Sequence, residues 1–207
     1  MRSIPRVVSV VALLLGVASC SSNKNDRPSE PTCTETNAVT VKFGTDAVDV
    51  PPAFTLKSTI AFAAIDRPES GQRGRSVSIA FGNYDLRDTL SSRSTVPFNN
   101  PEQPGEVAVV VEFHTDQTPS TFEQERDVYR KSPLLAGTYP AGFGATSKFF
   151  EIGVLAKGGG GSILTAGTAA VTVSTPTRVC GTFEAVNSTD GTKATGSFNV
   201  AVKDADK

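Results

Sequence analysis

The feature of this sequence that most constrains its fold is a two-residue periodicity between Glu106 and His114. Every second residue from Val107 to Phe113 is a large apolar one, so in an extended strand these side chains share one face. The alternate positions, which include Glu112 and His114, fall on the other face. This pattern is typical of a half-buried β-strand.

Weaker stretches of the same kind predict further strands, separated by turns. The sequence is rich in Gly, Ser, Thr and Val, and β-branched side chains fit a pleated sheet while glycine adopts turn conformations. About eight or nine strands favour an all-β fold, an antiparallel β-sandwich, with a barrel as the weaker alternative. Strands are expected at Glu106–His114, Ala38–Phe43, Phe54–Leu56, Thr59–Ile65, Ser76–Phe81, Lys148–Leu155, Ser162–Thr165 and Ala169–Ser174.

The C-terminal region predicts a β-hairpin formed by Thr177–Val186 and Lys193–Lys203. The loop between them contains Asp190-Gly191, and glycine supplies the positive φ that such a turn needs. Phe183 and Phe198 occur in matching Gly-x-Phe contexts and are expected on the core-facing side of the two strands.

One segment, Thr121–Arg130, carries helix signals. Ser120 and Glu123 have the spacing of a capping box, and Pro133 would end the helix. The segment is densely charged, so a long loop or a strand remains an alternative. We expect at most this one short helix.

The N-terminus has the features of an export signal. Met1–Arg6 carries two arginines and no acid, and Val7–Val17 is almost wholly apolar. A run of about eleven residues is short for a membrane-spanning helix, which needs roughly twenty, and matches the core of a signal peptide.

This run ends in Val17-Ala18-Ser19-Cys20, which resembles the lipobox of bacterial lipoproteins. The resemblance implies a signal peptide at 1–19, cleavage before Cys20 and a lipid on its thiol. Several acyl chains on this one cysteine would hold the protein in a membrane. It also implies that Ser21 favours the outer membrane. An ordinary secretory signal with an incidental cysteine and a spanning anchor are the alternatives.

The segment that follows the lipobox cysteine is polar, contains two prolines and offers little to bury. Residues 20–36 therefore predict a flexible stalk, and residues 37–204 predict the β-sandwich domain. Cys33, at the end of the stalk, and Cys180, on a late strand, are the two cysteines that remain after lipidation. Export places them in an oxidising compartment, where such a pair is expected to form a disulfide.

The region from Ala136 to Val202 is similar to small β-sandwich lipoproteins of bacterial envelopes whose function is mostly unassigned. The similarity lies in Ala-Gly-Thr-Tyr-Pro, a Gly-rich turn, a Thr/Val strand, Cys-Gly-Thr-Phe-Glu-Ala and a final Gly-Ser-Phe-Asn-Val. It implies a fold and a location and transfers no catalytic residue.

The charge balance argues against nucleic acid as a partner. Without residues 1–19, which hold two of the 20 basic residues, the chain has 18 Lys and Arg against 21 Asp and Glu, a net charge of about −3. The sequence does not predict a small-molecule cofactor. The glycine run Gly158–Gly161 is the candidate for a phosphate loop, but the Lys-Ser/Thr that such a loop needs does not follow it.

His114, the only histidine, has Asp116 two residues away, and the pair could supply two metal ligands or a base with its orienting acid. Zinc sites need three or four ligands, and the chain has no second histidine. We therefore predict a solvent-facing histidine at a strand end, with no metal site and no catalytic residue. Three acidic or amide groups are possible calcium sites or ordinary turn residues: Asp46 with Asp49, Asn83 with Asp85 and Asp88, and Asn187 with Asp190.

The sequence thus predicts a membrane-anchored envelope lipoprotein that acts as a non-catalytic binding or structural module. Its partner would be an envelope protein or a glycan, contacted through sheet edges or the loops at 83–104 and 115–133. The alternative is a lipid-anchored hydrolase or metal-dependent enzyme centred on His114 and Asp116.

Overall fold

The computed structural model describes residues 32–45, 50–66, 74–89, 98–116, 134–142, 148–157 and 161–204. All of them belong to one compact unit, Pro31–Lys207. These segments contain eleven strands and no α-helix. The expected helix at Thr121–Arg130 lies outside the described residues. The strands are β1 (Ala38–Lys42), β2 (Ser58–Asp66), β3 (Gly74–Gly82), β4 (Val107–Asp116), β5 (Gly137–Pro140), β6 (Lys148–Ala156), β7 (Gly161–Leu164), β8 (Ala166–Thr175), β9 (Arg178–Val186), β10 (Lys193–Ala201) and β11 (Lys203–Asp204).

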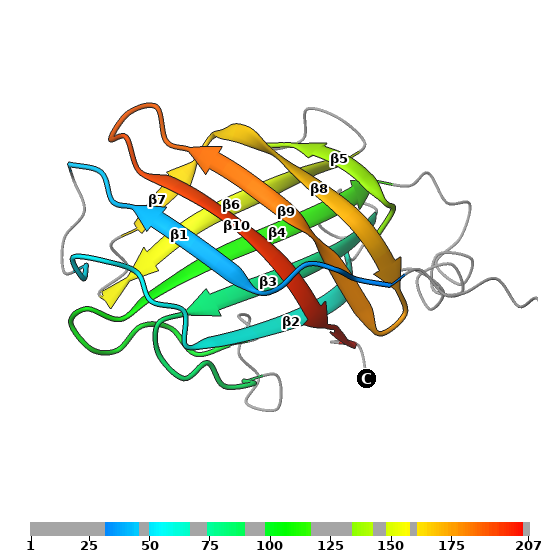
Figure 1. Cartoon of the computed structure of the whole chain (residues 1–207), viewed down its shortest axis with the longest axis horizontal. Coiled ribbons are helices and arrows are strands. Elements are labelled where there is room, and N and C mark those ends of the chain that lie inside the picture. The colour runs from blue at the N-terminus through cyan, green and yellow to red at the C-terminus, as the bar shows by residue number, and fades with distance from the viewer. Residues whose placement is uncertain are drawn as a thin grey trace, which may run out of the picture. The chain divides into compact units, whose positions relative to one another are not determined.

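The strands form two sheets that pack face to face as a β-sandwich. One sheet has the order β1-β10-β9-β8-β5, and the other has the order β11-β2-β3-β4-β6-β7. Neighbouring strands are antiparallel except for β11, which pairs with β2 in parallel. Figure 1 shows the strands of the two layers crossing one another. The predicted sandwich is confirmed, and the described strands do not close into a barrel.

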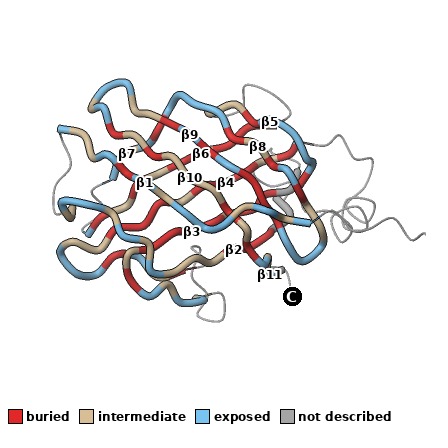
Figure 2. The backbone as a smooth tube through the Cα atoms, viewed as in Figure 1, coloured by how far each residue is buried: buried red, intermediate tan, exposed pale blue. Residues whose placement is uncertain are grey.

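The core lies between the layers and is built from alternate residues of the longer strands (Figure 2). Val107, Val109, Val111 and Phe113 of β4 are all fully buried, as the alternation in the sequence predicts. Burying such side chains stabilises the fold by roughly 1.5–3 kcal/mol each.

Phe113 is the centre of an aromatic cluster that joins the two sheets. Its ring centroid lies 5.3 Å from that of Tyr139, 6.0 Å from Phe150 and 5.4 Å from Phe198. Tyr139 is completely buried, and its hydroxyl donates a 2.6 Å hydrogen bond to the carbonyl of Leu135. The buried hydroxyl group is thereby satisfied.

The C-terminal hairpin forms as predicted, with each aromatic side chain lying across from a glycine. Phe183 of β9 is paired with Gly196 of β10, and Phe198 of β10 is paired with Gly181 of β9. A methyl group on Gly196 would lie 2.6 Å from the Phe183 ring. The repeated Gly-x-Phe pattern therefore reflects two rings that each occupy the space above a glycine.

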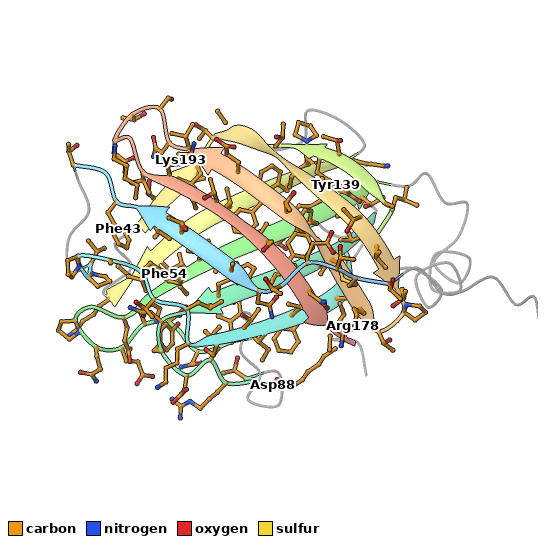
Figure 3. The ribbon with its side chains drawn as sticks, in the orientation of Figure 1. Phe43, Phe54, Asp88, Tyr139, Arg178 and Lys193 are labelled. Atoms are coloured by element: carbon orange, nitrogen blue, oxygen red, sulfur yellow. A yellow bond between two sulfur atoms is a disulfide. The ribbon has the colours of Figure 1, made fainter. Side chains whose placement is uncertain are left out.

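Three expectations about the strands are wrong. Phe54–Leu56 is not a strand; Phe54 and Leu56 are partly buried against the core, so packing alone accounts for their apolar spacing. Phe54 lies at the same end of the sandwich as Phe43 (Figure 3). Conversely, β5 is an unpredicted edge strand of four residues, and β11 is a separate short strand where the sequence predicts a continuous one to Lys203.

Short backbone pairings also join the two sheets. After β10 the chain crosses to the other sheet, where β11 pairs with β2. After β5, Ala141 forms an isolated bridge to Phe150 of β6. These short bridges tie the edges of the sandwich together.

Candidate functional site

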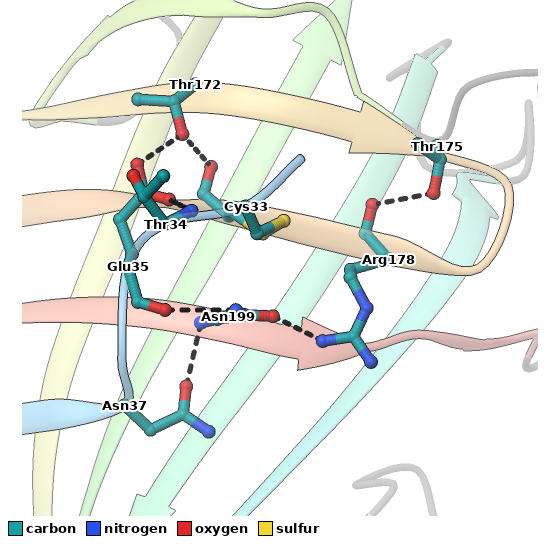
Figure 4. The surroundings of a disulfide bond; sticks show 9 residues. Cys33, Thr34, Glu35, Asn37, Thr172, Thr175, Arg178 and Asn199 are labelled. Atoms are coloured by element: carbon teal, nitrogen blue, oxygen red, sulfur yellow. Dashed lines mark hydrogen bonds between the residues drawn. A yellow bond between two sulfur atoms is a disulfide. The ribbon is translucent and has the colours of Figure 1, made fainter. Parts of the chain in front are cut away.

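Cys33 and Cys180 lie at disulfide distance on the outer face of the five-stranded sheet (Figure 4). Their Cα atoms are 5.8 Å apart, within the range that a disulfide requires. Cys180 is on β9, with its side chain on the face opposite Val179 and Phe183. Residue 33 is therefore attached to a central strand of the sheet.

The residues after Cys33 are also fastened to this face by hydrogen bonds (Figure 4). Thr172 donates a 2.6 Å bond to the Glu35 carboxylate, which holds the pKa of Glu35 below its usual value. The Asn199 side chain donates to the carbonyl of Glu35 at 2.9 Å, and the Ser197 hydroxyl donates to the carbonyl of Thr36 at 2.6 Å. The C-terminal end of the predicted stalk is thus part of the folded domain.

A second cluster of functional side chains lies on the outer face of the other sheet. Glu112 and His114 project from β4, two residues apart, and Glu151 projects from the neighbouring strand β6. The pairing of the strands sets Glu112 directly opposite Glu151, and His114 directly opposite Phe149. One nitrogen of His114 and one carboxylate oxygen from each glutamate all lie within 4.8 Å of one another.

The histidine of this cluster is held in a defined position. The His114 ring stacks on the Phe149 ring, with centroids 4.6 Å apart and planes inclined by 14°. Its side chain is 12% exposed, and its Nε2 lies 3.9 Å from a carboxylate oxygen of Glu112. The predicted solvent-facing histidine is therefore wrong, because the aromatic neighbour on β6 covers the imidazole.

The outer face around the cluster is also more buried than an open sheet surface. Phe62, Ala80, Ala108 and Phe149 all point away from the core cluster, yet each is at most 5% exposed. Low exposure lowers the local dielectric, which makes the interactions of charged groups there stronger.

The sequence predicted only one member of this cluster. His114 was singled out with Asp116, which ends β4 and whose side chain lies outside the described residues. Glu112 could have been found from its place two residues before His114, on the same face of the strand. Glu151 could not, because only the register between β4 and β6 brings it to the site.

The possible calcium sites in the loops have other roles where the structure describes them. Asn83 accepts a hydrogen bond from the backbone N–H of Val107 and donates one to Gly105, so it closes its own loop. Asp85 forms an ion pair with Lys57 at 2.9 Å. Asp88, labelled in Figure 3, forms an ion pair with Lys203 at 3.0 Å.

Asp190 and Asn187 act as turn residues. Asp190 accepts hydrogen bonds from the backbone and hydroxyl of Thr192 and from the hydroxyl of Ser162, and these lower its pKa. Asn187 accepts a bond from the N–H of Thr189 at 2.7 Å. Asp46 and Asp49 lie outside the described residues.

The two described parts of the 83–104 loop are joined by a hydrogen bond from the buried Tyr84. The hydroxyl of Tyr84 donates a 2.8 Å hydrogen bond to the carbonyl of Asn99. Burial, together with the nearby carboxylates of Glu106 and Glu102, raises the pKa of Tyr84 to about 12. Of the other predicted loop, 115–133, residues 117–133 lie outside the described part of the chain.

No protein-family model, curated protein or solved structure matches this chain at a significant level. In the part of the chain that the structure describes, no helix is long and apolar enough to cross a membrane.

Proposed function

We propose that this protein is an exported lipoprotein, anchored through lipid on Cys20, whose β-sandwich is a non-catalytic binding module of the cell envelope. The lipobox-like sequence supports the anchor, and Ser21 supports the outer membrane. The module would bind an envelope protein or a glycan, without a small-molecule cofactor and without nucleic acid.

The observation that carries this proposal is the attachment of residues 33–37 to the domain. Cys33 lies only 13 positions after the predicted lipid-bearing Cys20, with 12 residues between them. Fully extended, such a segment spans at most about 45 Å, and as a flexible coil it averages roughly 20 Å. The proposed anchor would therefore keep a folded, disulfide-linked domain close to a bilayer, which suits a protein that binds other envelope components.

The direct test is acylation of the protein in its own cell type. Metabolic labelling with a fatty acid, followed by mass spectrometry of the N-terminal peptide, should find acyl chains on Cys20. Cys20→Ser should abolish the label, whereas Cys33→Ser is the matched control and should keep it. An unmodified Cys20 in the wild-type protein, or a mature N-terminus elsewhere, contradicts the proposal.

A second candidate function is a metal-dependent hydrolase, because His114 lies beside two carboxylates. Its centre would be Glu112, His114 and Glu151, with Asp116 as an untested fourth member. A panel of ester, phosphoester and peptide substrates separates the two functions. Turnover that a chelator removes, and that Glu151→Gln also removes, favours the enzyme over the binding module.

A further inference from the structure

The cluster on β4 and β6 combines the side chains that bind zinc-like ions. An imidazole nitrogen and carboxylate oxygens bind Zn²⁺ at about 2.0–2.2 Å. Around a tetrahedral ion, such bonds place ligand atoms about 3.4 Å apart. The three ligand atoms here lie within 4.8 Å of one another, and His114 Nε2 is 3.9 Å from Glu112. Small side-chain rotations on fixed strands are enough to reach that spacing.

The two negative carboxylates of the cluster would also be stabilised by a bound cation. Glu112 and Glu151 face each other across the β4–β6 pair, and like charges in directly opposite positions destabilise a sheet. One oxygen of the Glu151 carboxylate, Oε1, is buried and has no hydrogen-bond partner among the residues that the structure describes. Leaving a buried acceptor without a hydrogen bond is unfavourable, and more so when the group is charged. A bound cation would remove both costs.

The neighbouring residues hold the imidazole as a ligand should be held. The stacking of His114 on Phe149 fixes the ring plane, and both residues lie in regular strands with a continuous register. Sites built on strands are more rigid than sites built on loops, so the loss of side-chain freedom on binding is small.

From these observations we infer that Glu112, His114 and Glu151 bind one divalent transition-metal ion of the Zn²⁺ class. The imidazole favours such ions over Ca²⁺ and Mg²⁺, which prefer oxygen ligands alone. Three protein ligands leave a coordination position open, and Glu112, whose side chain is 38% exposed, marks the side from which water or a partner's group reaches the ion. The inference does not depend on the lipid anchor.

The test uses the whole protein, purified without a histidine tag and stripped of metal by a chelator. His114 is the only histidine in the chain, so its imidazole signals in an NMR spectrum are unambiguous. On titration with Zn²⁺ these signals should shift and saturate at about one equivalent, and isothermal titration should give the same stoichiometry. Addition of Ca²⁺ or Mg²⁺ in excess should leave the signals in place.

Glu151→Gln and Glu112→Gln each remove one carboxylate ligand at constant side-chain size. Each variant should bind Zn²⁺ at least about tenfold more weakly. Glu184→Gln is the matched control, because Glu184 is an exposed glutamate on the other sheet, and its zinc affinity should equal that of the wild type. A circular dichroism spectrum confirms that each variant is folded. Unmoved His114 signals, or equal zinc affinity in Glu151→Gln and the wild type, overturn the inference.

Discussion

Replacing Cys33 with serine is the clearest test of how the stalk is joined to the domain. The two cysteines are 147 positions apart. A cross-link that closes a loop of this length lowers the entropy of the unfolded chain by an amount worth about 5 kcal/mol in the chain-entropy model. Cys33 is only half-buried, so serine at this position should cause little loss of packing. Cys180 stays fully buried, where a thiol behaves as a small apolar group.

We therefore expect Cys33→Ser to lower the free energy of unfolding by about 3–5 kcal/mol, a large part of the 5–15 kcal/mol typical of a domain. The assay is urea unfolding of the protein without reductant. With a urea dependence of about 2 kcal/mol per M, the midpoint should fall by roughly 2 M. Wild-type protein treated with dithiothreitol provides the internal control, and its unfolding curve should coincide with that of the variant.

Two results would refute this reasoning. One is a Cys33→Ser variant whose unfolding free energy lies within about 1 kcal/mol of the wild type, since the cross-link then contributes far less than the loop length implies. The other is chemical: reaction of Cys33 and Cys180 with a thiol reagent in the unfolded, unreduced wild-type protein would show that the two residues are not cross-linked.

Two further predictions concern the core and the loop base. Gly196→Ala puts a methyl group 2.6 Å from the Phe183 ring and should cost about 1–3 kcal/mol in urea unfolding, since overpacking forces strands apart. Gly153→Ala, whose methyl group would have its nearest neighbour at 3.9 Å, is the control and should be tolerated. The pKa of Tyr84 is raised to about 12 in the folded protein, against about 10 in the unfolded chain. The contribution of this shift to the free energy of unfolding is therefore complete below about pH 10 and is lost as the pH rises through 12. Wild type should therefore lose about 1.4 kcal/mol more than Tyr84→Phe between about pH 9 and pH 11, and parallel losses in the two proteins would contradict this assignment.

Much of the fold could be predicted because a local pattern specifies it. The apolar alternation in the sequence of β4 predicts its burial because only one face of the sheet packs on the core. Alternate residues of the strand therefore alternate between the core and the outer face. The C-terminal hairpin was predictable for a similar reason. Asp190-Gly191 fixes the turn, with Gly191 at a φ of 78°, and the turn fixes which residues of β9 and β10 are paired.

The parts that could not be predicted depend on contacts distant in sequence. β5 is a strand because Gly137–Pro140 pairs with β8, and its four residues have no local alternation strong enough to predict this. Glu151 reaches His114 only through the β4–β6 register. The same register places the Phe149 ring against the imidazole of His114. The sequence pattern could not predict this contact, so it did not predict that the His114 side chain is covered.

The two candidate sites lie on opposite outer faces of the sandwich, and this separation bears on how the protein would work. Cys33 and the residues after it occupy the outer face of the five-stranded sheet, whereas Glu112, His114 and Glu151 lie on the outer face of the six-stranded sheet. A lipid on Cys20 would be joined to the domain at residue 33, on the first of these faces. The face bearing the carboxylates would then lie on the far side of two packed layers from the point of attachment. The point where the stalk joins the domain and the proposed ion-binding residues therefore do not share a surface.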